Sequence, residues 1–212
     1  MQIDHIFIFS SEQGREADEL IQFGLVEGSN RIHPGQGTRN RKFYFKNFFL
    51  ELVWVSNENE IKSPATAPTR LWERANYKIN GYSPFGLCME PTDDVEELFE
   101  GCLKYSPDYI SDEQTFEIIT QENSPQLPWA CRVPHASEFD KLTDHPNGLQ
   151  KLSKVTFGVK GAFRPNRFTE VLSSKALIEF ENNDDHCLTL EFDEHRTGQT
   201  KHFDSLPLVI VY

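Results

Sequence analysis

The 212-residue sequence has no apolar run of about 18 residues, the length that a membrane-spanning helix requires. It also opens without the basic and apolar regions of a signal peptide. Cysteines are few, and none of them has the CxxC spacing of redox or metal motifs. We therefore expect a cytoplasmic protein without a membrane partner and with free thiols at Cys88, Cys102, Cys131 and Cys187.

Basic residues are scarce as well, because 21 Lys and Arg stand against 33 Asp and Glu, for a formal net charge of -12. Binding of nucleic acid or of an anionic membrane needs a basic face, so the sequence predicts neither as a main partner. A local basic pocket is compatible with this charge, and a small anionic ligand is not excluded. The G-x-S-x-G, P-loop and dinucleotide-binding motifs are absent, which disfavours serine hydrolases and nucleotide-dependent enzymes.

The sequence does contain many aromatic residues, 17 of them Phe, and two apolar runs that each carry one ionisable side chain. His5 lies within residues 3–9, and Glu51 lies within residues 48–55. A run that is apolar on both faces is typical of a strand covered on both sides. A carboxylate there is unfavourable unless it is paired, hydrogen-bonded or metal-bound. We infer a site that contains both side chains; the alternative is a buried pair that only orders the strands.

The order of the expected elements repeats along the chain. The first unit, residues 1–56, is expected to contain strand 3–9, helix 16–23, an extended piece 25–32, a turn-rich loop 33–38, and strands 41–45 and 48–55. The second unit, 81–134, follows a linker at 57–80 and is expected to contain strand 85–89, helix 95–103, and strands 109–110, 116–119 and 129–133. The third unit, 150–212, follows a linker at 135–149 and is expected to contain helix 167–172 and strands 152–159, 177–181, 187–192 and 208–211.

This repetition predicts a single domain of the α+β class, built from βαβββ units. Units placed edge to edge form curved mixed sheets around a cleft, with helices on the outside. Because the first and fourth strands of a unit line the cleft, His5 and Glu51 would lie close together. The apolar last strand, 208–211, is expected between other strands, since an exposed edge of this kind promotes association. We expect a monomer or a homodimer.

Three stretches resemble the vicinal oxygen chelate superfamily, and within it the glyoxalase-like branch of the glyoxalase, bleomycin resistance and dioxygenase fold. They are Ile3-Asp4-His5, the loop from His33-Pro34-Gly35 to Asn40-Arg41, and Leu50-Glu51-Leu52. The match is tight over roughly residues 3–55 and looser from there to residue 208. The resemblance implies paired βαβββ units around a ligand-binding cup.

The resemblance also implies a divalent metal in the cup, with His5, Glu51 and, if the third unit closes the cup, Glu191 as ligands. Such donors suit Zn, Mn, Fe, Co or Ni. The second unit offers Cys88, Cys131 and Arg132 where the family pattern has His or Glu, so a full ligand set is not visible. Glu51 is expected as a ligand or as a catalytic base. The expected substrate-binding residues are Arg39, Asn40, Trp54 and Arg132.

The function that the resemblance implies is a metal-assisted lyase, isomerase or dioxygenase acting on a small oxygen-rich metabolite. The alternative is a metal-free protein that binds or sequesters a small molecule, like the resistance proteins of the superfamily. Arg132 favours that alternative, because a guanidinium would repel a metal ion and would pair with a carboxylate or phosphate.

Overall fold

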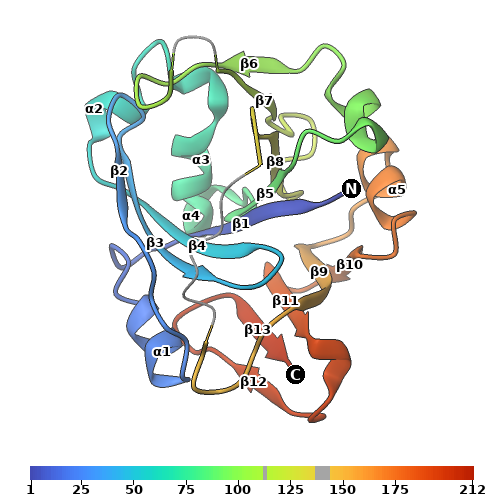
Figure 1. Ribbon diagram of the computed structural model, residues 1–212. Helices are drawn as coiled ribbons and strands as arrows, with labels where there is room; N and C mark the ends of the chain where they lie inside the picture. The colour runs from blue at the N-terminus through green and yellow to red at the C-terminus, as the bar shows by residue number, and fades with distance from the viewer. Residues whose placement is uncertain (112–113, 137–143) are drawn as a thin grey trace.

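The computed structural model describes residues 1–111, 114–136 and 144–212, whose strands form two sheets (Figure 1). The larger sheet has 8 strands in the order β2-β3-β4-β1-β5-β8-β7-β6. In that order the strands are Arg31–His33, Thr38–Tyr44, Phe49–Val55, Ile3–Phe9, Phe85–Met89, Trp129–Arg132, Phe116–Ile119 and Leu103–Tyr105. The sheet is curled, as Figure 1 shows. Side chains of its inner face line a hollow, and the predicted α+β class is confirmed.

The larger sheet consists of two halves with the same pairing. In the first half β1 runs parallel to β4, the last strand of its unit, and in the second half β5 runs parallel to β8 in the same way. The antiparallel pair of β1 and β5 joins the halves at the centre of the sheet. The first two predicted units therefore combine edge to edge.

The C-terminal segment forms a separate sheet of 5 strands in the order β10-β9-β11-β13-β12. Its strands β9 to β13 are Leu152–Lys160, Ile178–Asn183, Cys187–Phe192, Thr200–His202 and Leu208–Val211. Here β9 runs parallel to β10, the strand directly after helix α5 (Arg167–Ser173), so the pairing differs from that of the first two units. The strand β12 was not expected. The terminal strand β13 lies between β11 and β12, as its apolar sequence predicted.

The two sheets pack face to face, and this contact forms the main core. The rings of Phe85 on β5 and Phe157 on β9 have centroids 6.0 Å apart, and those of Phe45 and Phe192 are 4.7 Å apart. Burial of such rings is the largest favourable contribution that a core of this kind provides. The smaller sheet therefore covers the outer face of the larger one, while the inner face lines the hollow. This double cover explains why the runs around His5 and Glu51 are apolar on both faces.

The helices are short, and those within residues 58–75 pack on the inner side of the larger sheet, where Ile61 and Leu71 share a buried cluster with Phe7 and Trp129. Besides α5, the helices are α1 (Ala17–Gln22), α2 (Glu58–Ile61), η1 (Ala67–Thr69), α3 (Leu71–Ala75), α4 (Tyr77–Asn80), η2 (Asp93–Phe99) and η3 (Asp193–His195). Among the described residues, no helix combines the length and apolarity needed to cross a bilayer.

Local structure differs from expectation in three places. The linker 57–80 contains helices α2 to α4, which are held in place by Arg74, whose buried guanidinium donates to the carbonyls of Ser83, Thr120 and Leu127. The segment 93–99 is a 3-10 helix rather than an α-helix, and Thr92 makes no side-chain cap. The second strand of the second half is β6, residues 103–105, in place of residues 109–110.

Candidate active site

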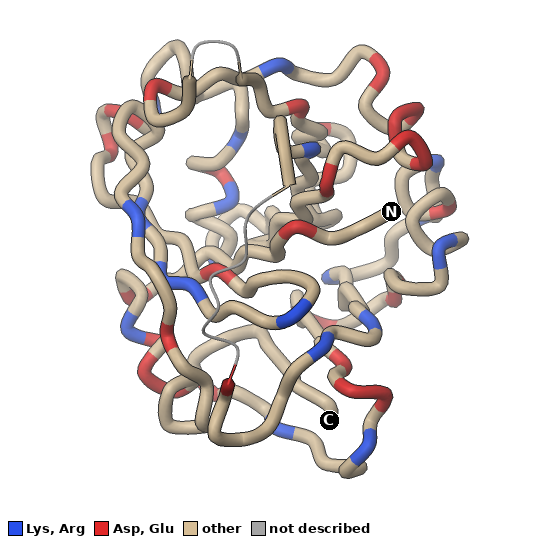
Figure 2. The backbone as a smooth tube through the Cα atoms, in the orientation of Figure 1, with Lys and Arg blue, Asp and Glu red and all other residues tan. Residues whose placement is uncertain are grey.

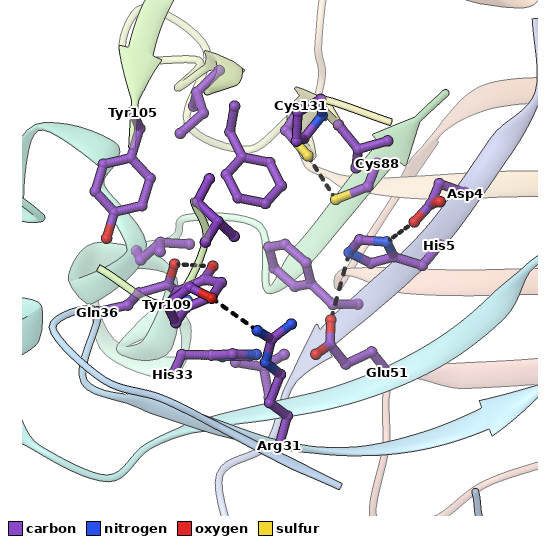
Figure 3. Close-up of a pocket in the computed structure, with 18 of the residues that line it drawn as sticks. Asp4, His5, Arg31, His33, Gln36, Glu51, Cys88, Tyr105, Tyr109 and Cys131 are labelled. Carbon is purple, nitrogen blue, oxygen red and sulfur yellow. Dashed lines mark hydrogen bonds and ion pairs between the residues drawn. The ribbon is translucent and has the colours of Figure 1, made fainter. Parts of the chain in front are cut away.

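The inner face of the curled sheet lines a cavity of ≈ 180 Å³ (Figure 3). Side chains alternate along a strand, so β4 directs Phe49, Glu51 and Val53 into the cavity. Leu50 and Leu52 point the other way, into the core between the sheets. The pairing register then brings β1 against β4 and places His5 beside this row.

His5 and Glu51 face each other across a short gap. His5 Nε2 lies 3.6 Å from Glu51 Oε2, which is longer than a hydrogen bond. On the far side of the imidazole, Asp4 Oδ1 lies 2.5 Å from Nδ1. Adjacent residues of a regular strand point to opposite faces, but the register of β1 against β5 shifts between Ile3 and His5, and a bulge of this kind re-aims side chains. Asp4 therefore holds Nδ1, and Nε2 is left to face Glu51 and the cavity.

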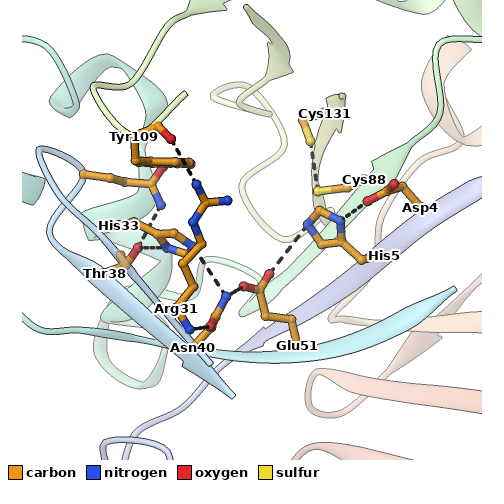
Figure 4. A network of polar contacts seen from close by, with 11 residues as sticks. Asp4, His5, Arg31, His33, Thr38, Asn40, Glu51, Cys88, Tyr109 and Cys131 are labelled. Carbon is orange, nitrogen blue, oxygen red and sulfur yellow. Dashed lines mark hydrogen bonds and ion pairs between the residues drawn. The ribbon is translucent and has the colours of Figure 1, made fainter. Parts of the chain in front are cut away.

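Glu51 is held in a fixed orientation from its other side by Asn40 of β3. The Asn40 side-chain amide donates to Glu51 Oε1, while its Oδ1 accepts the backbone N–H of Arg31 at 2.6 Å (Figure 4). Since the oxygen of the amide is occupied by an N–H group, its nitrogen must face the carboxylate. One oxygen of Glu51 is thus satisfied by Asn40, and the other is directed at His5.

A buried histidine, His33 of β2, supports Asn40. Its Nε2 accepts from the Asn40 amide at 3.4 Å, so its ring proton lies on Nδ1, which donates to Thr38 Oγ1 at 2.8 Å. Gln36 also donates to Thr38 Oγ1, and Tyr109 donates its hydroxyl to Gln36. Burial lowers the pKa of His33 to about 4, so this imidazole is neutral at neutral pH.

The pKa of Glu51 lies below its ordinary value. Burial alone would raise it, but the electrostatic interactions with His5, His33 and Lys42 and the hydrogen bond from Asn40 together outweigh burial. The carboxylate is therefore ionised at neutral pH although its side chain is only 5% exposed. A buried, ionised carboxylate with one oxygen directed into a cavity can accept a proton or bind a cation.

Aromatic rings and two cations complete the cavity wall. Phe49 stacks on His5 with ring centroids 4.5 Å apart, and Tyr109 packs against His33 with centroids 4.9 Å apart. The two cations are Arg31 and Lys42. The sequence interpretation did not assign a role to Arg31, Lys42 or Tyr109, and it treated His33 as part of a turn. Alternation within each of the two strands 31–33 and 38–44 could have identified Arg31, His33 and Lys42, because it places every second side chain of a strand on one face.

The second half of the sheet brings two thiols to the cavity. Cys88 of β5 and Cys131 of β8 are register partners, and their Sγ atoms lie 2.9 Å apart. Burial, together with the hydrogen bond and charge interaction with Cys131, raises the pKa of Cys88 well above its ordinary value, so its thiol is protonated at neutral pH. Among the described residues, no three His, Cys, Asp or Glu side chains are grouped to hold a metal. His5 and Glu51 supply two donors, and these residues do not fit a complete divalent-metal site.

Of the predicted site residues, the structure brings together His5, Glu51 and Asn40. Arg39 and Trp54 lie on the opposite face of the sheet, where the guanidinium carbon of Arg39 is 6.0 Å from the Trp54 ring. Neighbouring positions of a strand face opposite sides, so Arg39 next to Asn40 and Trp54 next to Val53 do not line the cavity.

Arg132 and Glu191 also lie outside the cavity. Arg132 follows Cys131 on β8, points to the other face and pairs with Glu117. Glu191 lies on β11 of the smaller sheet, with its Oε2 2.5 Å from His195 Nε2. The smaller sheet covers the back of the larger one, so it cannot close the cup, and the expectation that Glu191 joins His5 and Glu51 is corrected.

Comparison with known proteins agrees with this geometry. The sequence model of the glyoxalase-like domain family matches residues 3–173. The chain belongs to this family. Membership supports a small-molecule enzyme or binding protein and leaves the specific activity open. No curated protein matches the sequence.

Several solved structures are similar to this member of the glyoxalase-like domain family. A hypothetical protein from Staphylococcus aureus has a TM-score of 0.55 at 11% identity, over 99% of this chain and 98% of that one. A methylmalonyl-CoA epimerase has a TM-score of 0.40 at 14% identity, over 65% of this chain and 97% of its own. A hypothetical protein from Bacillus halodurans has a TM-score of 0.40 at 13% identity, over 66% and 97%. The Staphylococcus aureus structure shows that the whole fold, including the smaller sheet, occurs elsewhere.

Proposed function

We propose that this protein is an acid–base enzyme, an isomerase or a lyase, which moves a proton on a carbon next to a carbonyl group of a small oxygen-containing metabolite. The observation that carries the proposal is the row Asp4–His5–Glu51 on the cavity wall. Its two inner groups, His5 Nε2 and Glu51 Oε2, lie 3.6 Å apart and both line the cavity, so a ligand there can contact both. An acid and a base that face one reacting position are the minimum for proton transfer.

In the proposed reaction, Glu51 accepts the carbon-bound proton, and the electron pair of that bond moves onto the carbonyl oxygen. A proton on His5 Nε2 stabilises the resulting oxyanion, while Asp4 Oδ1 holds the other side of the imidazole at Nδ1. Return of a proton to the same or a neighbouring carbon completes an isomerisation, and loss of a leaving group from the neighbouring carbon completes an elimination. Asn40 positions Glu51 for this step through its hydrogen bond to Oε1.

A metal-assisted form of the reaction would need donors beyond His5 and Glu51, and the described residues do not supply them. Metal content is the measurement that separates the two forms. Protein purified without chelators would be analysed for Zn, Mn, Fe, Co and Ni, beside the variants His5→Gln and Glu51→Gln. A stoichiometric metal that both variants lose would overturn the metal-free form of the proposal and restore the metal-assisted one.

The direct test is exchange of carbon-bound hydrogen with solvent. Small 2-oxo acids, 3-oxo acids and hydroxyketones would be incubated with the protein in D₂O, and deuterium incorporation followed by NMR. We expect catalysed exchange in at least one compound and a loss of about 10²–10⁴-fold in Glu51→Gln. Glu191→Gln is the matched control, because Glu191 also lies in a strand beside a histidine but outside the cavity. Equal exchange by wild type and Glu51→Gln would refute the proposal.

A second candidate function is ligand binding without turnover. It is favoured by the second half of the sheet, where the Cys131 thiol donates a hydrogen bond to Cys88 and the two offer no acid or base to a ligand. Screening the same compounds by thermal shift would distinguish the two candidates. Ligands that raise the melting temperature in the absence of any exchange would support the binding protein.

A further inference from the structure

Two cations line the cavity wall without a close ion pair to any described residue. Arg31 of β2 and Lys42 of β3 line the cavity, and neither forms an ion pair in the described parts of the chain. Acidic residues are plentiful, 33 against 21 basic ones, and they are spread over the whole backbone (Figure 2). On the other face of β3, Arg41 pairs with two of them, Glu27 and Asp18.

Strand register places the two cations around the candidate acid–base pair. Arg31 is the partner of Asn40 between β2 and β3, and Lys42 is the partner of Glu51 between β3 and β4. Partners across an antiparallel pair share a face, and so do residues two positions apart on one strand. The side chains of Arg31, Asn40, Lys42 and Glu51 therefore point to the same side. The positive groups flank Glu51 from the side of β2 and β3, while His5 lies on the side of β1.

Aromatic rings hold the cations where other proteins would use carboxylates. Arg31 Nη2 donates to the Tyr109 carbonyl at 3.0 Å, and its guanidinium carbon lies 5.0 Å from the centre of the Tyr109 ring (Figure 3). Lys42 Nζ lies 5.1 Å from the centre of the Phe49 ring, the same ring that stacks on His5. Cation–π contacts of this kind orient the positive groups without neutralising them. Their remaining N–H groups can therefore bind an anion.

We propose that Arg31 and Lys42 form an anion-binding subsite and that the ligand of this cavity is a small monocarboxylic acid with an apolar or aromatic body. The carboxylate lies between the two cations at the half-exposed rim, because a guanidinium fork matches its two oxygens. The body lies among the aromatic rings of the wall, for which ≈ 180 Å³ leaves room for a compact group. The inference rests on the proposed function in one respect, because the carbon of the ligand that reacts is placed beside His5 and Glu51.

The two cations also affect how an anionic ligand reaches the cavity. A protein with a net charge of -12 repels a free acid at a distance, whereas a local pair of positive groups at a cavity mouth reverses the sign of the potential there. Binding of the acid is therefore expected to weaken as salt is added, since added ions screen the groups at the rim.

The experiment compares acids with their uncharged amides. Benzoate, phenylacetate and phenylpyruvate would each be titrated beside the matching amide, with binding followed by ligand-observed NMR at low and high salt. We expect at least one acid to bind at least about tenfold more tightly than its amide, with a preference that decreases at high salt. Arg31→Gln and Lys42→Gln should each weaken binding of the acid about tenfold and leave binding of the amide unchanged.

Arg39→Gln is the matched control. It removes one positive charge from β3, but on the opposite face of the sheet, next to Trp54. Absence of binding by every acid, equal binding of acids and amides, or an equal loss in Arg39→Gln would each overturn the subsite. The outcome is separable from that of the proposed function. Selective binding of acids without deuterium exchange would support the anion-binding subsite and overturn the proposed enzymatic function. Deuterium exchange without a preference for acids would support the enzymatic function and overturn the subsite.

Discussion

The buried histidine His33 makes the stability of this protein depend on pH in a way that can be calculated. Its side chain is 8% exposed, and burial lowers its pKa from 6.5 to about 4. In the unfolded chain the imidazole takes up a proton as pH falls through about 6.5, whereas in the folded protein it stays neutral until about 4. The unfolded state thus binds more protons between these values, so the free energy of unfolding falls as pH falls through this window.

The size of the effect follows from the two pKa values. The full difference corresponds to about 3 kcal/mol, at ~1.36 kcal/mol for each pH unit. Between pH 8 and pH 5, linkage predicts that about 2 kcal/mol of stability is lost through His33 alone. Other buried groups, such as His145 with its lowered pKa, add losses of the same sign, so the effect must be isolated by a variant.

The variant His33→Gln keeps an amide that can bond to Thr38 and Asn40 but cannot take up a proton. Urea denaturation of wild type and variant across this pH range would give the free energy of unfolding of each. We expect the difference between them to shrink by about 2 kcal/mol from pH 8 to pH 5. His202→Gln, at an exposed histidine of β12, is the control and should leave the pH dependence unchanged. If the free energies of unfolding of wild type and His33→Gln differ by the same amount at every pH, the reasoning is refuted.

Two further predictions concern the centre of the larger sheet. Gly86→Ala should lower stability by about 1–3 kcal/mol, because a Cβ there would lie 2.0 Å from the buried Phe7 ring; unchanged urea denaturation would contradict this packing. Cys88 and Cys131 should react with iodoacetamide far more slowly than the two half-buried cysteines, because burial and their mutual hydrogen bond raise the pKa of Cys88. Peptide mass spectrometry after timed labelling of the native protein would measure this, and equal rates at all positions would disprove it.

Local patterns in the sequence were enough to predict the central strands and to place His5 and Glu51 close together. Apolar runs located β1, β4 and β5, and the cost of burying an ionisable group singled out His5 and Glu51. The repeated element order predicted how the two halves join. The last strand, β13, carries no charge, and this composition predicted its position between β11 and β12, since an exposed edge of that composition is unfavourable.

The face of each strand that lines the cavity depends on tertiary packing instead. Asn40 reaches Glu51 while its neighbour Arg39 faces away, and Cys131 lines the cavity while Arg132 does not. A shift of one residue exchanges the faces, and the sequence specifies alternation but not its phase relative to the curl of the sheet.

The C-terminal segment shows the same limit at a larger scale. Its sequence echoes that of the first unit, and Glu191 stands in a stretch similar to that around Glu51. Its first strand nevertheless pairs with the strand that follows its helix, and the resulting sheet covers the back of the larger one. Apolar strands of similar composition can pair in more than one order, and long-range packing selects the order that buries the outer face of the larger sheet. The sequence therefore specified the strands and the pair His5 and Glu51, and packing specified which residues surround that pair.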